Sequence, residues 1–182
     1  IEDVGPMDLY SCFPSVVQIT MNELGITPDR EVTTTGGLSF FGGPMNSYVV
    51  HAIASTVDAV RTTRDIGFVH GNGGYATKHA CAVYGPEPPE KSFRRENLQS
   101  EIDTYPTRSV DMNPAGASVI EAYTVLHGRE GPETALITSI MGDGRRALTS
   151  STDLSLMDSM LREEFIGKSL EFHTDGSFGV NA

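Results

Sequence analysis

The chain has 182 residues, of which 38% are hydrophobic and 20% are charged, and this composition is typical of a soluble globular protein. Its net charge of -11 argues against nucleic-acid binding, because phosphate contacts need clustered Lys and Arg. One small basic cluster, Lys91, Arg94 and Arg95, fits either a solvated linker or a phosphate site. No apolar run approaches the roughly 20 residues of a membrane helix, so we expect a cytoplasmic protein without a membrane span.

Sulfur and imidazole groups are too few and too scattered to indicate a metal site. Cys12 and Cys81 make neither a disulfide framework nor a zinc site, and the five histidines show no ligand spacing. We therefore expect no metal. The chain begins at Ile1 rather than Met, which leads us to expect a processed chain or a piece of a longer polypeptide, although a trimmed start would look the same.

The first 85 residues predict alternating helices and strands. Ser11 is placed to cap a helix whose apolar residues recur at helical spacing, with Gly25 placed to end it. Asn46 is placed to cap a second helix, whose broad apolar stripe predicts nearly complete burial. Residues 66–70 and 77–84 predict two strands joined by a tight turn at 71–74.

Prolines and glycine at 85–89, followed by a polar stretch, predict a break between two domains. Beyond the break, strands are expected at 119–126, 134–141 and 145–149, then a short helix at 154–161 and a last hairpin through Asp175 and Gly176. We place one domain at 1–88, a linker at 89–112 and a small β-rich domain at 113–182. A core of some 70 residues is small, so we expect this second domain to dock on the first.

Three loops of the first domain hold the residues that could carry chemistry. Cys12 lies at a helix start, where unpaired N–H groups and the helix dipole lower the pKa of a thiol, but a lone cysteine is often an inert buried residue. Residues 35–46 are rich in glycine and lead into the second helix, which fits either close approach of an anionic ligand or a plain turn. Residues 70–75 could present His70 to a site or form a simple turn.

The order and spacing of these loops resemble the C-terminal half of the thiolase superfamily, most closely its sterol-carrier-protein thiolases and acetyl-CoA acetyltransferase-like proteins. The resemblance covers roughly residues 1–85, and residues 115–182 resemble the additional C-terminal β-domain of one thiolase-like subgroup. It implies a layered α/β/α first domain with the thiolase fold, followed by a small, mostly-β, barrel-like domain.

In that superfamily the N-terminal half carries the nucleophilic cysteine, and the C-terminal loops supply acid, base and oxyanion groups. The first family loop reads His-Asp-Cys-Phe, and Tyr10, Ser11, Cys12 and Phe13 stand at its positions. The resemblance thus makes Cys12 the proton-transferring thiol. Tyr10 replaces the histidine of the oxyanion hole, and its phenol could donate a hydrogen bond there.

The other two loops depart further from the family. Gly42, Gly43 and Pro44 match Gly-His-Pro, so the imidazole base is missing and we expect an enlarged pocket at Gly43. Loss of a general base costs about 10²–10⁴-fold, which puts standard thiolase activity in doubt. In the third loop, Cys-x-Gly, Gly73 matches the glycine and Gly71 stands for the cysteine; a shift of one residue would bring His70 or Asn72 to the site.

The resemblance therefore implies the C-terminal part of an acyltransferase-like protein of lipid metabolism. We expect coenzyme A or acyl-CoA as substrate or ligand, no covalently bound cofactor, and an N-terminal thiolase-like half as partner, on a separate chain or the same polypeptide. The candidate catalytic residues are Cys12, Tyr10 and His70, and the candidate substrate-binding residues are Gly42, Gly43, Pro44, Asn46, Asn72 and Gly73. The alternative is a non-catalytic scaffold that binds a partner or carrier.

Overall fold

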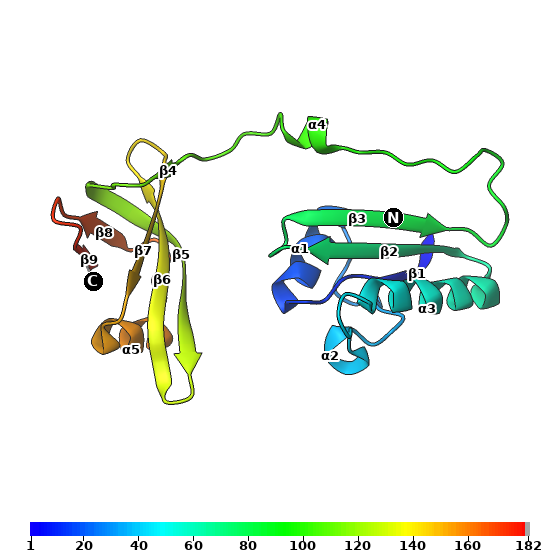
Figure 1. The fold of residues 1–182 in the computed structure, drawn as a ribbon, viewed down its shortest axis with the longest axis horizontal. Helices are drawn as coiled ribbons and strands as arrows, with labels where there is room; N and C mark the ends of the chain where they lie inside the picture. The colour runs from blue at the N-terminus through cyan, green and yellow to red at the C-terminus, as the bar shows by residue number, and fades with distance from the viewer. Residues whose placement is uncertain (181–182) are drawn as a thin grey trace. The chain divides into compact units, whose positions relative to one another are not determined.

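The computed structural model describes residues 1–180, and its internal contacts divide the chain into two compact units, Ile1–Arg95 and Glu96–Ala182. Figure 1 labels the helices and strands of both units. Residues 181 and 182, the end of the predicted second domain, lie outside the described part.

The first unit is a three-stranded sheet with helices on both faces. Strand β2 pairs in parallel with β1 and antiparallel with β3. Phe68 of β2 packs in a core cluster with residues of α1, whereas Val69 packs with residues of α3. Successive strand residues point to opposite faces, so α1 and α3 cover opposite sides and confirm the predicted α/β/α layering. The elements are β1 (Val4–Asp8), α1 (Pro14–Leu24), α2 (Leu38–Phe41), α3 (Tyr48–Thr63), β2 (Ile66–Gly73) and β3 (Lys78–Tyr84).

The helix ends of the first unit differ from the sequence prediction at both N-termini. Gly25 does end α1 in the left-handed conformation, with φ of 65°. The predicted caps are wrong, because α1 starts after Phe13 and α3 after Ser47, and neither start has a side-chain cap. Pro14 suits the first turn of α1 because its ring fixes a helical φ and it has no N–H to satisfy. The hydroxyl oxygen of Ser11 instead accepts a hydrogen bond from the N–H of Leu38.

Helix α3 packs on the sheet along a single stripe. Its buried residues are spaced four apart, at Tyr48, Ala52, Thr56 and Val60. The helix lies so close to β2 that a Cβ on Gly67 would come within 2.6 Å of a methyl group of Val60. The prediction of a nearly buried helix is wrong for the described residues, because only the side facing the sheet is buried and Val50 on another side is exposed.

The β2–β3 hairpin places a candidate residue on the sheet itself. The predicted turn at 71–74 is wrong in position, because β2 continues through Gly73 and the turn follows it. In the register of β2 and β3, Gly71 pairs with Ala80 and Asn72 pairs with His79, so the strand pairing extends through most of the glycine-rich stretch. Asn72 therefore projects from a paired strand, which holds its side chain more firmly than a turn would.

The second unit is a six-stranded sheet that curls into a half-barrel around α5, as the barrel-like prediction expected (Figure 1). Asp153 caps α5 by accepting hydrogen bonds from the N–H groups of Ser155 and Leu156. Leu170 and Met157 lie at the centre of its core. The elements are α4 (Gln99–Ile102), β4 (Val110–Asp111), β5 (Gly116–Gly128), β6 (Gly131–Met141), β7 (Arg146–Ser151), α5 (Leu154–Arg162), β8 (Ser169–Phe172) and β9 (Phe178–Val180).

Candidate functional site

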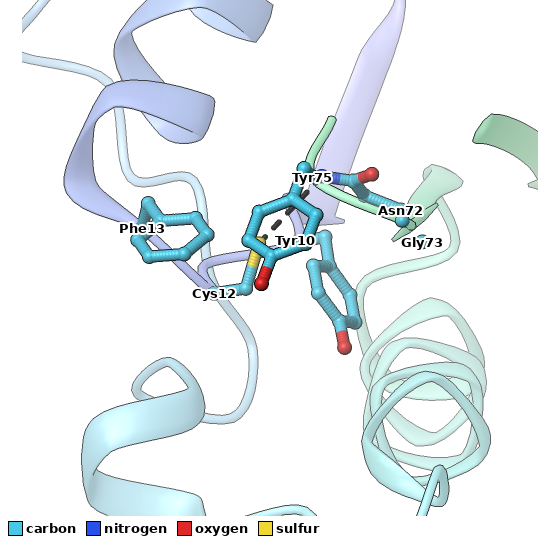
Figure 2. A pocket seen from close by; sticks show the side chains of 7 residues that line it. Tyr10, Cys12, Phe13, Asn72, Gly73 and Tyr75 are labelled. Atoms are coloured by element: carbon cyan, nitrogen blue, oxygen red, sulfur yellow. Dashed lines mark hydrogen bonds between the residues drawn. The ribbon is translucent and has the colours of Figure 1, made fainter. Parts of the chain in front are cut away.

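The first and third candidate loops meet at one pocket of the first unit. The pocket has a volume of about 260 Å³ and lies where the loop after β1 approaches the end of β2. Figure 2 shows its labelled side chains grouped around the sulfur of Cys12. The lining residues are Tyr10, Cys12, Phe13, Asn72, Gly73, Gly74 and Tyr75.

The amide of Asn72 makes the polar contact with the thiol. Its Nδ2 donates to Sγ of Cys12 over 3.6 Å, which Figure 2 marks with a dashed line. This contact fixes the position of the sulfur relative to the end of β2. The two residues are 60 positions apart in sequence, so the fold, not local sequence, creates this pair.

Aromatic rings form much of the pocket wall. Phe13 and Tyr75 are exposed, and Tyr75 is 91% accessible at the tip of the hairpin. Tyr75 has φ of 51°, a conformation that costs a non-glycine residue about 1–2 kcal/mol. Tyr10 packs edge-on against the ring of Tyr48, with centroids 5.4 Å apart. The pocket therefore offers one thiol and one amide among apolar surfaces, as small-molecule sites commonly do.

A buried carboxylate that the sequence analysis missed holds the loops around this pocket. Asp8 is fully buried at the end of β1. Its Oδ1 accepts a hydrogen bond from the Tyr48 hydroxyl at 2.8 Å. Its Oδ2 lies within 2.9–3.3 Å of backbone or hydroxyl donors on Thr33, Thr34 and Thr35. Asp8 thus ties three segments to one point: β1, the threonine run and the start of α3.

No pattern in the sequence distinguishes Asp8 from an ordinary surface aspartate. A buried carboxylate is tolerated only when donors surround it, and those donors lie about 25 to 40 residues away in sequence. The one local signal is the run Thr33, Thr34 and Thr35, which supplies three hydroxyls directly before a glycine pair. Burial raises the pKa of the Tyr48 phenol and the nearby Asp8 carboxylate adds to that rise, so Tyr48 acts as a hydrogen-bond donor at neutral pH.

Tyr48 also explains what happens at the position of the missing histidine. A Cβ on Gly43 would lie 2.9 Å from Cβ of Tyr48 and 3.5 Å from a methyl group of Leu38. The expected enlargement of the pocket at Gly43 is therefore wrong, because the side chain of Tyr48 takes up the space beside it. A histidine at this position would require Tyr48 to move.

The rest of the glycine-rich loop does not line the pocket. Gly42 has φ of 76° and ends the short helix α2, while Pro44 and Asn46 are exposed. Their assignment to substrate binding, with that of Gly43, stays a prediction. Among residues 1–180, no three His, Cys, Asp or Glu side chains gather as metal ligands would, and no helix is long and apolar enough to cross a membrane.

His70 lies on β2 but outside the pocket lining. It is only 3% exposed, and its Nε2 lies 2.9 Å from Nδ1 of His79. Burial lowers the pKa of His70, and the positive charge of protonated His79 would lower it further. His70 is therefore a neutral imidazole at pH 7. Whether it is catalytic stays a prediction.

Comparison with known proteins found thiolase-like matches for most of the second unit and for the whole chain. Residues 97–177 match the additional C-terminal domain of thiolase-like protein type 1. The whole chain is similar to a solved structure, a monomeric SCP2-thiolase-like protein type 1 from Mycobacterium smegmatis, with 32% identity and a TM-score of 0.86. The match covers 100% of this chain and 41% of that one. A search of curated proteins found no match. The resemblance found in the sequence is confirmed.

Proposed function

Since the chain is thiolase-like in sequence and fold, with residues 97–177 matching the type 1 additional domain, we propose that it is the C-terminal part of a protein that binds a coenzyme A thioester. The observation that carries this proposal is the contact between Asn72 and Cys12 inside a pocket whose lining includes three aromatic residues. A thioester needs a site where a thiol and hydrogen-bond donors meet on a largely apolar surface.

In this proposal Cys12 is the proton-transferring thiol. Asn72 orients its sulfur, and Cys12 gives up a proton or takes one back while a second thiol carries the acyl group. The Tyr10 phenol is available as a donor near the thioester oxygen. An N-terminal thiolase-like half would supply the nucleophilic cysteine and the rest of the acyl pocket. The chain spans 41% of the solved relative, so the activity of the whole protein is part of the proposal.

An acyltransferase role in lipid metabolism and a cytoplasmic location fit coenzyme A chemistry and belong to the same proposal. Transfer of an acyl group between two sulfur atoms needs no metal, because the thiolate is itself a strong nucleophile and the coenzyme A thiolate a good leaving group. The chain's own residues would position the thioester and move the proton at Cys12.

One observation favours a second function, a non-catalytic scaffold that binds a partner or carrier. The position of the family's base carries no imidazole, and a Cβ on Gly43 would lie 2.9 Å from Cβ of Tyr48, whose hydroxyl donates to Asp8. A site without its base, and without room for one, suits binding better than turnover.

Alkylation of Cys12 tests the proposal. We expect acetyl-CoA to slow the reaction of Cys12 with iodoacetamide severalfold, because a thioester in the pocket covers the sulfur. The measurement is mass spectrometry of the peptide around Cys12 over a time course. Cys81, the other cysteine, lies on β3 away from the pocket lining and serves as an internal control whose rate should not change.

A variant of Asn72 tests the role of the amide in the same assay. Asn72→Leu keeps the branched shape of the side chain but removes the amide donor, so the alkylation rate of Cys12 at pH 7 should fall severalfold. Equal rates with and without acetyl-CoA would contradict coenzyme A binding here and favour the scaffold. An Asn72→Leu rate equal to that of the unmodified sequence would contradict the role given to Asn72.

A further inference from the structure

His70 and His79 form a linked pair between the interior and the surface of the first unit. Their rings are nearly parallel, with centroids 5.2 Å apart, and a hydrogen bond of 2.9 Å joins Nε2 of His70 to Nδ1 of His79. His70 is buried, whereas His79 is exposed. The second nitrogen of His79, Nε2, lies 3.0 Å from the carbonyl oxygen of Ala76.

These contacts fix the positions of the protons. A carbonyl oxygen only accepts, so Nε2 of His79 must carry a hydrogen. In the neutral ring, Nδ1 of His79 is then an acceptor, and Nε2 of His70 must donate to it. His70 is neutral, so its remaining nitrogen, Nδ1, carries no hydrogen. That atom is buried and has no hydrogen-bond partner among the described residues.

The opposite arrangement is less favourable. If His79 were protonated on both nitrogens, it would donate to Nε2 of His70, and the hydrogen of His70 would sit on Nδ1. Nδ1 has no acceptor within hydrogen-bond distance, so this would leave a buried N–H unsatisfied. Unsatisfied buried N–H groups are rarer in proteins than unsatisfied acceptors, which reflects their cost.

The unprotonated nitrogen belongs to the same face of the sheet as the thiol site. His70 and Asn72 are two residues apart on β2 and so point to one face, and the Asn72 amide contacts Cys12. The Oδ1 atom of Asn72 is a second buried acceptor without a partner. Two unmet acceptors on the face of the sheet that carries the thiol site suit a place where a proton arrives.

We propose that His70 is a base on the Cys12 side of the sheet, which takes a proton at Nδ1 and returns it, and that His79 is the positioning residue that holds its tautomer. This proposal deepens the proposed function and rests on it for the source of the proton. The pair itself stands on the geometry of β2 and β3 alone.

The proton transfer balances without any other reagent. His70 takes a proton at Nδ1 and becomes an imidazolium that still donates from Nε2 to Nδ1 of His79. It gives the same proton back from Nδ1, so both rings return to neutral imidazoles with their hydrogens on Nε2.

The direction of the pH effect follows from the neighbouring groups. The titratable side chains on this face of β2 and β3 are His70, His79 and Cys81, which pairs with His70 in the register, and Cys12 comes from the loop before α1. Burial lowers the pKa of His70, so its Nδ1 is free to accept a proton at neutral pH. In acid, protonation of His70 occupies Nδ1 and the base is lost. The site should therefore work at neutral pH and fail in acid.

Imidazole ¹⁵N NMR of the labelled protein tests the assignment. At pH 7.5 we expect His70 to show a protonated Nε2 and an unprotonated Nδ1. His79→Gln keeps an oxygen acceptor and should preserve this tautomer, whereas His79→Phe keeps a ring but no acceptor and should give a mixture. His127→Phe, in the second unit, is the control and should change nothing at His70. A His70 protonated at Nδ1 in the unmodified protein would overturn the proposal.

The alkylation rate of Cys12 tests the base role of His70. His79→Phe should lower that rate severalfold at pH 7, and His79→Gln should restore most of it. Equal rates in all three proteins would overturn this role. A failure of the proposed function would give another result. Acetyl-CoA would then not protect Cys12 from alkylation, while the His70 tautomer and the effect of His79→Phe on the alkylation rate would be unchanged.

Discussion

Asp8→Ala is expected to lower the free energy of unfolding of the first unit by about 3–5 kcal/mol. The substitution removes the acceptor for Tyr48 and for the donors on the threonine run, and these groups stay buried or partly buried. An orphaned buried donor costs about 1–3 kcal/mol, and some threonine hydroxyls can turn towards each other to limit the loss. Urea denaturation followed by hydrogen exchange of peptides from β1 and α3 measures the change in this unit.

Two further variants make that measurement decisive. Asp8→Asn keeps the shape but turns an N–H₂ group towards donors, and should cost about 2–3 kcal/mol. Asp58→Ala removes an exposed carboxylate from α3 whose partner, Arg61, is also exposed, and should change stability by no more than about 0.5 kcal/mol. A loss for Asp8→Ala no larger than that for Asp58→Ala would show that the cluster around Asp8 does not hold the first unit together.

Leu170→Ala should destabilise the second unit by about 2–5 kcal/mol, the usual range for truncating a fully buried leucine. Leu170 is fully buried on β8, within the cluster that joins the sheet to α5. The half-barrel has one small core, so neighbouring side chains have little freedom to close the cavity.

Leu148 provides the matched control, because it lies on β7 with 58% of its surface exposed. Leu148→Ala should change stability by no more than about 0.5 kcal/mol. Hydrogen exchange of peptides from β5 and β6 reports the second unit for both variants. Similar losses for the two leucines would mean that the core is not centred on Leu170.

Sequence patterns predicted most helices and strands because hydrophobic period and turn residues are local signals. The helix ending at Gly25, the strands of the second unit and the hairpin through Asp175 and Gly176 follow from residues close in the chain. Strand β1 was missed, because its five residues include a glycine and a proline, which are uncommon in strands. The predicted helix caps were wrong for a related reason. Ser11 accepts a hydrogen bond from the N–H of Leu38, and no local sequence pattern identifies Leu38 as its partner.

The candidate site was predictable only in part. Cys12, Tyr10, Asn72 and Gly73 were identified by resemblance, and the fold brings them to one pocket. Whether they are catalytic or bind substrate stays a prediction. The groups that support the site come from long-range pairing instead. Asp8 finds its donors on the threonine run and at the start of α3, and His79 meets His70 through the register of the β2–β3 hairpin.

The chain departs from the family pattern at Gly43 and in the third loop on β2, and the two changes have different structural outcomes. At Gly43 the lost imidazole is not replaced by open space, because Tyr48 crowds the position. On β2, His70 has a protonation state that suits a base, although it does not line the pocket. Whatever acid–base chemistry survives in this half would therefore depend on the sheet face near Cys12 and not on the start of α3.

A crystal structure of the protein with a non-hydrolysable thioether analogue of acetyl-CoA tests the central claim most directly. Our account predicts that the analogue's sulfur lies against Cys12 and Asn72, with its acyl group among Tyr10, Phe13 and Tyr75. An analogue bound elsewhere, or no bound analogue at concentrations that saturate related thiolases, would contradict coenzyme A thioester binding at this pocket.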